Sequence, residues 1–207
     1  MKHSRAPEPL KRLVIATANA GKLREFRTLL AGLPFDVRAQ SSLGVAPPEE
    51  TGSSFLSNAL LKARHAAAAT GAAAIADDSG LEVDALGGAP GIHSARYAGV
   101  GADSSANNAK LVAALAGVPM QERRARYRCV LVFLDGPQDQ TPLTAEGVWE
   151  GYVLKTPRGS GGFGYDPYFW LPELEATAAE LAPEDKNRRS HRGQALRSLR
   201  EQLAARA

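Results

Sequence analysis

Cysteine is almost absent from this chain, since Cys129 is the only one among 207 residues. A single cysteine excludes an intramolecular disulfide and a zinc site built from several thiolates. Cys129 lies in the apolar run RYRCVLVFLDG, where a buried structural thiol is expected rather than a nucleophile. The lack of disulfide chemistry fits a reducing, cytoplasmic location.

Long apolar runs are also missing. The run LVIATA is far too short to span a bilayer, so no membrane partner is expected. The basic start MKHSRAPEPLK is not followed by an apolar segment of the kind found in signal peptides. Its composition predicts a flexible leader over residues 1–11, followed by one domain over residues 12–207 without an interdomain linker. A hydrophobic content of 44% is enough for a core of that size.

The chain carries little net charge, with a formal value of +3. Basic residues nevertheless gather in two stretches, at residues 122–128 and 185–200. A local basic patch suits an anionic partner, which could be a nucleotide or a nucleic acid. Charge alone does not choose between the two.

The spacing of apolar residues predicts alternating strands and helices in the first half of the chain and clustered strands in the middle. Strands are predicted at residues 13–16, 72–76, 127–134 and 143–149, and helices around 23–30, 55–63 and 111–115 and from Ser190 onward. Ser53 or Ser54 is expected to cap the second helix, and Ser190 the last one. This order predicts an α/β fold with a mixed sheet.

The first candidate for chemistry is the segment TANAGK, Thr17–Lys22, between a predicted strand and a predicted helix. The start of a helix offers unpaired N–H groups and a positive dipole end to an anion. Lys22 adds a full charge suited to phosphate oxygens, and Asn19 can reach a phosphate or a sugar hydroxyl. The Walker spacing is absent, and an ordinary strand-to-helix connection with a solvated lysine explains the segment equally well.

The second candidate is the acidic pair Asp77-Asp78, which follows a small apolar strand. Adjacent carboxylates there are costly unless water, a metal or a hydrogen-bond donor offsets them. Mg²⁺ binds through one or two carboxylates together with substrate phosphates, and one Asp could also orient or deprotonate a water. The alternative is a turn in which an Asp caps the chain at Gly80. Glu49-Glu50 supplies further carboxylates, although acidic residues near a helix start need no other explanation.

A glycine-rich loop, GSGGFGYDP at residues 159–167, is the third candidate. Its glycines permit close approaches that side chains would block. Phe163 and Tyr165 offer ring faces for a planar base. Asp166 offers a polar group that can discriminate between bases. A glycine-rich hairpin with its aromatics packed inward is the competing interpretation.

The fourth candidate is the basic run that includes Lys186, His191 and Arg192. Such a run is usually a solvated face, and a histidine in it is more often on the surface than catalytic. Because it precedes a helix with an apolar stripe, some of its side chains could instead be held near a cleft as phosphate or base contacts.

Taken together and in order, these segments resemble the inosine/xanthosine triphosphate pyrophosphatase family. The matching pieces are TANAGKLREF, ETGSSFLSNALLKARHA, AIADDSGLEVDALGGAPGIHSARYAG, GSGGFGYDPYF and KNRRSHRGQAL. The resemblance implies a two-lobed α/β fold with a long central mixed β-sheet flanked by helices, an active-site cleft between the lobes and a homodimer. It also implies Mg²⁺-dependent hydrolysis of dITP, ITP and XTP to the monophosphate and pyrophosphate, which cleanses the nucleotide pool.

The resemblance assigns roles to residues of this chain. Asp78 is the expected proton acceptor and metal ligand, with Glu50 as the second metal carboxylate and Ser79 as a substrate contact. Lys62 is a weaker candidate for facing the phosphates. The expected triphosphate loop consists of Thr17, Ala18, Asn19, Ala20, Gly21 and Lys22. The expected base loop consists of Phe163, Gly164, Tyr165 and Asp166, and the expected C-terminal nucleotide contacts are Lys186, His191 and Arg192.

One position departs from the family pattern. Many relatives read Phe-x-Glu-Asn-Ala where this chain has Ser57 in place of the Glu. If that Glu helps to set the metal or its waters, Ser57 changes this detail.

Two alternatives stay open at this point. One is a pyrophosphatase for other modified nucleotides, such as methylated pyrimidine triphosphates. The other is a nucleic-acid-binding module, against which stand the weak net charge and the acidic clusters that would repel a phosphate backbone. A nucleotide substrate without nucleic acid is therefore the expectation. A buried donor to the 6-oxo group, from a backbone N–H, His191 or Arg192, would discriminate against adenine.

Overall fold

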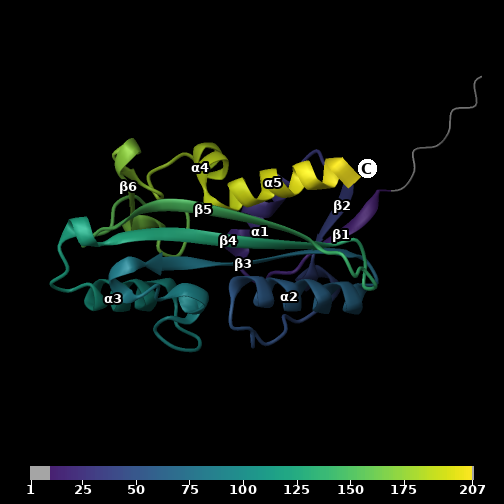
Figure 1. The fold of residues 1–207 in the computed structure, drawn as a ribbon, viewed down its shortest axis with the longest axis horizontal. Helices are drawn as coiled ribbons and strands as arrows, with labels where there is room; N and C mark the ends of the chain where they lie inside the picture. Colours follow the sequence, from purple (N-terminus) through teal and green to yellow (C-terminus); the bar gives the residue numbers. More distant parts are fainter. Residues whose placement is uncertain (1–9, 207) are drawn as a thin grey trace, which may run out of the picture.

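The computed structural model describes residues 10–206, so residues 1–9 of the predicted leader lie outside the described part. A seven-stranded sheet with the order β2-β1-β3-β4-β5-β6-β7 forms the centre of the molecule (Figure 1). β1 runs parallel to β2 and β3, and every other neighbouring pair is antiparallel. The predicted mixed sheet and α/β class are therefore confirmed. The strands are β1 Lys11–Ile15, β2 Phe35–Ala39, β3 Ala73–Val83, β4 Arg124–Leu134, β5 Leu143–Val153, β6 Phe169–Leu171 and β7 Ala176–Thr177.

Helices cover both faces of this sheet. α5 lies along one face over β4 and β5, while α2 packs on the other face against β3 and β4 (Figure 1). The helices are α1 Ala20–Leu29, α2 Phe55–Thr70, α3 Ser104–Ala114, α4 Pro183–Arg189 and α5 His191–Arg206. None of the helices in the described part combines the length and the apolar character that crossing a membrane requires.

Two of the predicted helix caps are present. The Ser54 side chain accepts a hydrogen bond from the Ser57 N–H at 3.1 Å, and the Ser57 hydroxyl accepts one from the Ser54 N–H at 3.0 Å. This reciprocal pair is a capping box, in which Ser57 occupies the position usually held by Glu or Gln. Ser190 precedes α5, and its hydroxyl accepts from the Gly193 N–H at 3.2 Å.

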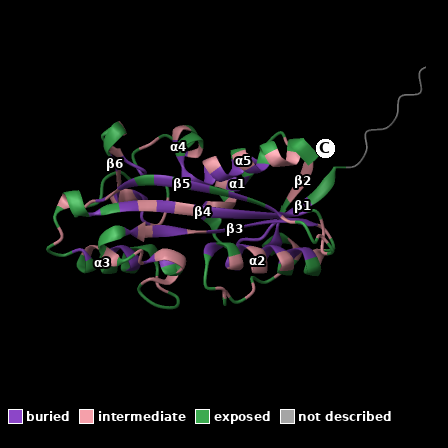
Figure 2. Cartoon of the chain, in the orientation of Figure 1, coloured by how far each residue is buried: buried purple, intermediate pink, exposed green. Residues whose placement is uncertain are grey.

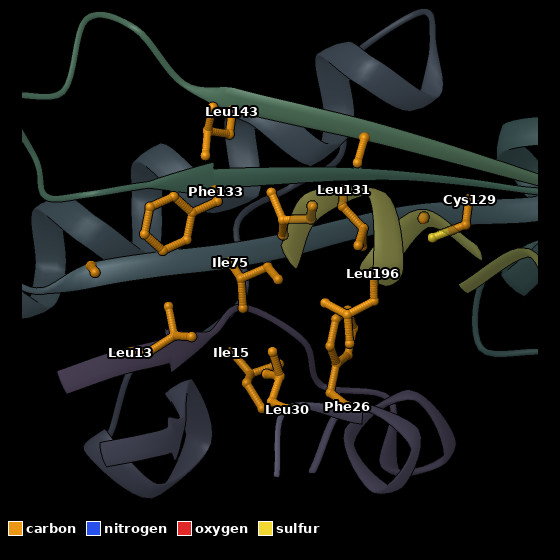
Figure 3. Packing of buried hydrophobic residues seen from close by; sticks show 14 residues of the cluster. Leu13, Ile15, Phe26, Leu30, Ile75, Cys129, Leu131, Phe133, Leu143 and Leu196 are labelled. Atoms are coloured by element: carbon orange, nitrogen blue, oxygen red, sulfur yellow. The ribbon is translucent and has the colours of Figure 1, made fainter. Parts of the chain in front are cut away.

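The buried side chains form separate clusters on the two halves of the long strands. Near the start of β3, an apolar cluster joins β1, α1, β4 and α5, with Phe26, Ile75 and Leu196 among its members (Figure 3). Alanines of α2 pack on the opposite face of the same half. A further cluster joins the far half of β3 to α3 and β6 through residues such as Leu81, Leu111 and Phe169. In Figure 2 the buried residues, drawn in purple, are concentrated along the sheet.

Between these clusters β3 carries Asp77, Asp78, Ser79 and Gly80. All four pair in register with β4, and Asp78 lies opposite Val130. The segment is therefore the middle of an eleven-residue strand. The alternative of an Asp-capped turn at Gly80 is wrong, because the antiparallel ladder with β4 continues straight through it.

Candidate active site

A pocket of about 430 Å³ opens where the two halves meet. It brings together side chains from β3, the start of α1, the glycine-rich loop and the start of α5, which are far apart in the sequence. Its lining includes Asn19, Lys22, Glu50, Asp78, Ser79, Phe163, Gly164, Tyr165, Asp166, Lys186, His191 and Arg192. The pocket thus draws on every sequence segment that was predicted to carry chemistry.

The loop after β1 presents the positive end of α1 to this pocket. Asn19 is the N-cap residue, and its side-chain oxygen accepts a hydrogen bond from the Lys22 N–H at 3.0 Å. The Lys22 ammonium lies 2.9 Å from Asp77. Asn19 and Lys22 line the pocket, whereas Thr17, Ala18, Ala20 and Gly21 are not among its lining residues. The lysine of this loop is therefore held by a carboxylate rather than free in solvent.

Asp77 and Asp78 point to opposite faces of the sheet, because successive side chains alternate along a strand. Asp77 contacts Lys22 and Arg192 on the face covered by α5. Asp78 contacts Asn58 and Lys62 from α2, on the other face. The two carboxylates are 1% and 4% exposed respectively, and only Asp78 lines the pocket. The acidic pair is thus two separate sites.

On the α2 face, Lys62 bridges two carboxylates. Its Nζ lies 2.8 Å from Asp78 Oδ1 and 3.0 Å from Glu50 Oε1. Asn58 donates to Asp78 Oδ2 at 3.3 Å, and Arg96 donates to Glu50 Oε2 at 2.6 Å. Both predicted metal carboxylates therefore lie side by side, with their charges offset by two cations.

These contacts act on the pKa values of the acids in different directions. Burial raises the pKa of Asp78 above its ordinary range, although Lys62 and Lys22 oppose the shift. Burial also acts to raise the pKa of Glu50, but Lys62 and Arg96 outweigh it and hold that pKa low. The pKa of Asp78 is thus shifted in the direction that favours accepting a proton, whereas the pKa of Glu50 is shifted the other way.

On the α5 face, a second network surrounds Arg192, which is 1% exposed. Its guanidinium donates to Asp77 Oδ2 at 3.3 Å, to the Ser79 hydroxyl at 3.0 Å and to Glu25 of α1. Lys186 lies 2.8 Å from Glu25 and 2.7 Å from Asp166. Burial alone would raise the pKa of Asp77, but Lys22 and Arg192 together hold it far below its usual range. The basic run is therefore not a solvated face at these two positions.

The glycine-rich loop is fixed by Asp166, which is 3% exposed. Its Oδ2 accepts from the Phe163 N–H at 2.8 Å and from Lys186 at 2.7 Å. The Phe163 ring faces the Lys186 ammonium at 4.7 Å, and a Cβ added to Gly21 would lie 2.6 Å from that ring. The loop therefore packs against the first turn of α1. Tyr165 is turned inward, where its hydroxyl donates to the Ser94 carbonyl at 2.8 Å.

His191 is buried, with 5% of its surface exposed, so the alternative of a surface histidine is wrong. α5 begins at this residue, and its packing on β4 and β5 carries the imidazole inward. Burial lowers the pKa of His191 well below its ordinary value, and the charges of Arg192 and Lys186 lower it further. The ring is therefore neutral at pH 7, and its Nδ1 has no hydrogen-bond partner among residues 10–206.

Several residues of this site lie in the segments that carry the family resemblance but were not singled out from the sequence. Asn58 orients Asp78, Glu25 joins Lys186 to Arg192, and Arg96 holds Glu50. Each belongs to a segment that reads as ordinary helix or turn. A buried polar residue can be recognised only when its tertiary partner is known, because the helical pattern alone places Glu25 on a polar face.

The side chains of the pocket supply only some of the ligands that a hard divalent cation requires. No group of three or more His, Cys, Asp or Glu side chains that could hold a metal is found within residues 10–206. Asp78 and Glu50 are nevertheless two carboxylates at the pocket wall. Two carboxylates completed by substrate phosphates and water match the way in which Mg²⁺ is usually bound.

Comparison with known proteins gives consistent results. Residues 13–202 match the model of the Ham1 family. A dITP/XTP pyrophosphatase of Thioalkalivibrio sulfidiphilus is 59% identical over 195 residues, covering 94% of this chain and all of that protein. A dITP/XTP pyrophosphatase of Methylococcus capsulatus is 56% identical over 195 residues, covering 94% of this chain and 97% of that protein.

Solved structures agree with the sequence matches. A HAM1 protein from Coxiella burnetii superposes with a TM-score of 0.86 at 45% identity, covering 94% of this chain and 99% of that one. The Ham1 protein of Staphylococcus aureus gives a TM-score of 0.83 at 40% identity, covering 95% of this chain and 100% of that one. With the fold, the pocket and the matched length in agreement, the chain belongs to the Ham1 family.

Proposed function

We propose that this protein is a nucleoside triphosphate pyrophosphatase that converts dITP, ITP and XTP to the monophosphate and pyrophosphate. The observation that carries the proposal is that one pocket collects the α1 loop, the acidic strand, the glycine-rich loop and the start of α5. Full-length relatives named dITP/XTP pyrophosphatase, with identities of 56–59%, support dITP and XTP as substrates.

In the proposed arrangement the triphosphate lies across Lys22 and the acidic strand. Asp78 and Glu50 are the residues that would hold Mg²⁺, whose chemistry is to polarise phosphate oxygens and neutralise their charge. Asp78 orients the attacking water and accepts its proton, for which its raised pKa is favourable. Water attacks the α-phosphorus, the bond to the bridging oxygen breaks, and pyrophosphate leaves. Lys22 and Lys62 neutralise the charge that develops on the leaving phosphates.

The base is assigned to the other end of the pocket, beside Phe163, Asp166 and His191. A 6-oxopurine carries an acceptor where adenine carries an amino donor. A buried donor that the oxo group satisfies would be left unpaired by adenine, which is costly. The nucleic-acid alternative is disfavoured, because Lys186 and Arg192 are buried in ion pairs and are not displayed on a surface.

A substrate panel tests this function. Pyrophosphate release in the presence of Mg²⁺ is expected from ITP, dITP and XTP at a kcat/KM at least about 10²-fold above that for ATP or CTP. The same reactions with excess chelator are the control and are expected to lose activity. Equal rates on ATP, CTP and ITP would overturn the specificity, and no pyrophosphate from any triphosphate would overturn the reaction.

The proposal includes a homodimer located in the cytoplasm, in line with the family resemblance. One chain has a mass of 21.9 kDa, and light scattering coupled to size-exclusion chromatography is expected to give twice that mass. A mass that stays at one chain across micromolar concentrations would contradict the dimer.

A further inference from the structure

Tyr127 is a pocket residue to which the sequence assigns no role. It lies in the first half of β4, paired in register with Leu81 of β3 and Trp149 of β5. Its side chain is buried, with 8% exposed, yet it forms part of the pocket lining. A tyrosine in a strand of this kind is ordinarily explained as a core residue.

The contacts of Tyr127 go beyond core packing. Its hydroxyl donates to Asp166 Oδ1 at 3.2 Å. Its ring is stacked on the imidazole of His191, with centroids 4.7 Å apart and planes at 11°. Tyr127 therefore contacts both segments that surround the proposed base site, the glycine-rich loop and the first residue of α5.

Asp166 has little capacity left for a ligand once these contacts are counted. An ionised carboxylate has about four acceptor positions. Protein donors fill three of them, from Tyr127 on Oδ1 and from the Phe163 N–H and Lys186 on Oδ2. Asp166 thus holds the loop and the lysine in place and keeps about one acceptor position for a ligand.

The hydroxyl of Tyr127 can act only as a donor toward this carboxylate. Burial raises the pKa of Tyr127 well above its usual value, and the negative charge of Asp166 raises it further. The phenol therefore stays protonated at neutral pH. Without it, Asp166 Oδ1 would face a buried environment without a donor, and the carboxylate would be free to turn away from Phe163 and Lys186.

We propose that Tyr127 is a positioning residue for base recognition, which acts by fixing Asp166 through its hydroxyl and by supporting His191 through its ring. The proposal rests on the function given above, because it takes this end of the pocket to be the base site. It assigns Asp166 the role of orienting Phe163 and Lys186. It predicts that loss of the hydroxyl weakens recognition of the nucleoside and leaves recognition of the phosphates intact.

The test compares Tyr127→Phe with wild type and with Tyr152→Phe. Tyr127→Phe removes the hydroxyl and keeps the ring that stacks on His191. Tyr152 lies on the neighbouring strand β5, outside the pocket lining, and serves as the matched control. For each protein, KM and kcat with ITP, the inhibition constants of IMP and of inorganic pyrophosphate, and the unfolding temperature are measured.

Tyr127→Phe is expected to raise the KM for ITP and the inhibition constant of IMP about tenfold, the loss expected for a hydrogen bond to a charged group. The kcat is expected to stay within about twofold, and pyrophosphate inhibition and Tyr152→Phe are expected to match wild type. An unchanged inhibition constant for IMP, or an equal weakening for IMP and pyrophosphate, would overturn the positioning role.

All constants are measured well below the unfolding temperature of each variant, which keeps the test decisive if Tyr127→Phe is less stable than wild type. Tyr127→Leu, which also removes the stacked ring, is expected to weaken IMP further than Tyr127→Phe does, again without an effect on pyrophosphate. If wild type itself releases no pyrophosphate from ITP, the proposed function fails and this inference fails with it. If wild type is active and only the IMP–pyrophosphate difference is missing, the inference alone fails.

Discussion

Replacing Asp78 with Asn is expected to lower pyrophosphate release from ITP by roughly 10³-fold, within the range found for loss of a general base. Asn has nearly the same shape as Asp, so the packing against Asn58 is kept. It cannot accept a proton at the pH of the reaction and is a poorer cation ligand. Nucleotide binding is expected to remain, because Lys22, Lys186 and Arg192 are unchanged.

The measurement is steady-state pyrophosphate release, combined with an equilibrium titration of ITP to confirm binding. Asp36→Asn is the matched control, since Asp36 lies on β2 in a surface ion pair with Arg38. That variant is expected to keep full activity. Turnover by Asp78→Asn within tenfold of wild type would remove the role that is proposed for Asp78.

Replacing Arg192 with Met is expected to destabilise the fold by about 3–5 kcal/mol, the cost of breaking a buried ion pair from one side. Arg192 is nearly inaccessible, and it is shared by Asp77 and Glu25. Met fills much of the volume but leaves both carboxylates with one cation fewer. Urea unfolding at pH 7 measures the decrease in the free energy of unfolding.

The loss of stability in Arg192→Met is expected to depend on pH in a direction that can be stated in advance. Although burial opposes it, Lys22 and Arg192 hold the pKa of Asp77 far below its ordinary value of 3.8. Asp77 therefore contributes stability that is fully present above about pH 4 and is lost as the pH falls through its lower folded-state pKa. The Arg192→Met defect is expected to be largest at neutral pH and to shrink under strong acid.

Arg126→Met provides the comparison. Arg126 forms ion pairs with Asp84 and Glu150 on the surface, and its side chain is 28% exposed. Exposed pairs are worth about 1 kcal/mol or less, so this variant is expected to unfold close to wild type. If both arginine variants lost the same small amount, the buried network would not be the stabilising element that its geometry indicates.

The sequence predicted the sheet class and most elements, because apolar spacing and capping residues are local signals. The strand predicted at residues 13–16 overlaps β1, which runs over Lys11–Ile15. The helix caps are found at Ser54, one of the two predicted candidates, and at Ser190. Ser57, which departs from the family pattern, completes the capping box. Its place at the helix start can be read from the sequence.

The placement of Asp77 and Asp78 on opposite faces was not predicted. Asp-Asp-Ser-Gly has the composition of a turn, and local chemistry favours that interpretation. Pairing with β4 along the whole of β3 overrides it. Once the segment is known to be a strand, the alternation of side chains follows at once. The burial of His191 and Arg192 depends likewise on the packing of α5, which a charge run does not reveal.

The ion pairs in and around the pocket have a consequence for how a ligand arrives. Five cations (Lys22, Lys62, Arg96, Lys186 and Arg192) are matched by five carboxylates (Glu25, Glu50, Asp77, Asp78 and Asp166). The formal charges of this network cancel, so it exerts little long-range attraction on an anion. Capture of a triphosphate is then governed by the exchange of partners at close range, and its rate depends only weakly on ionic strength.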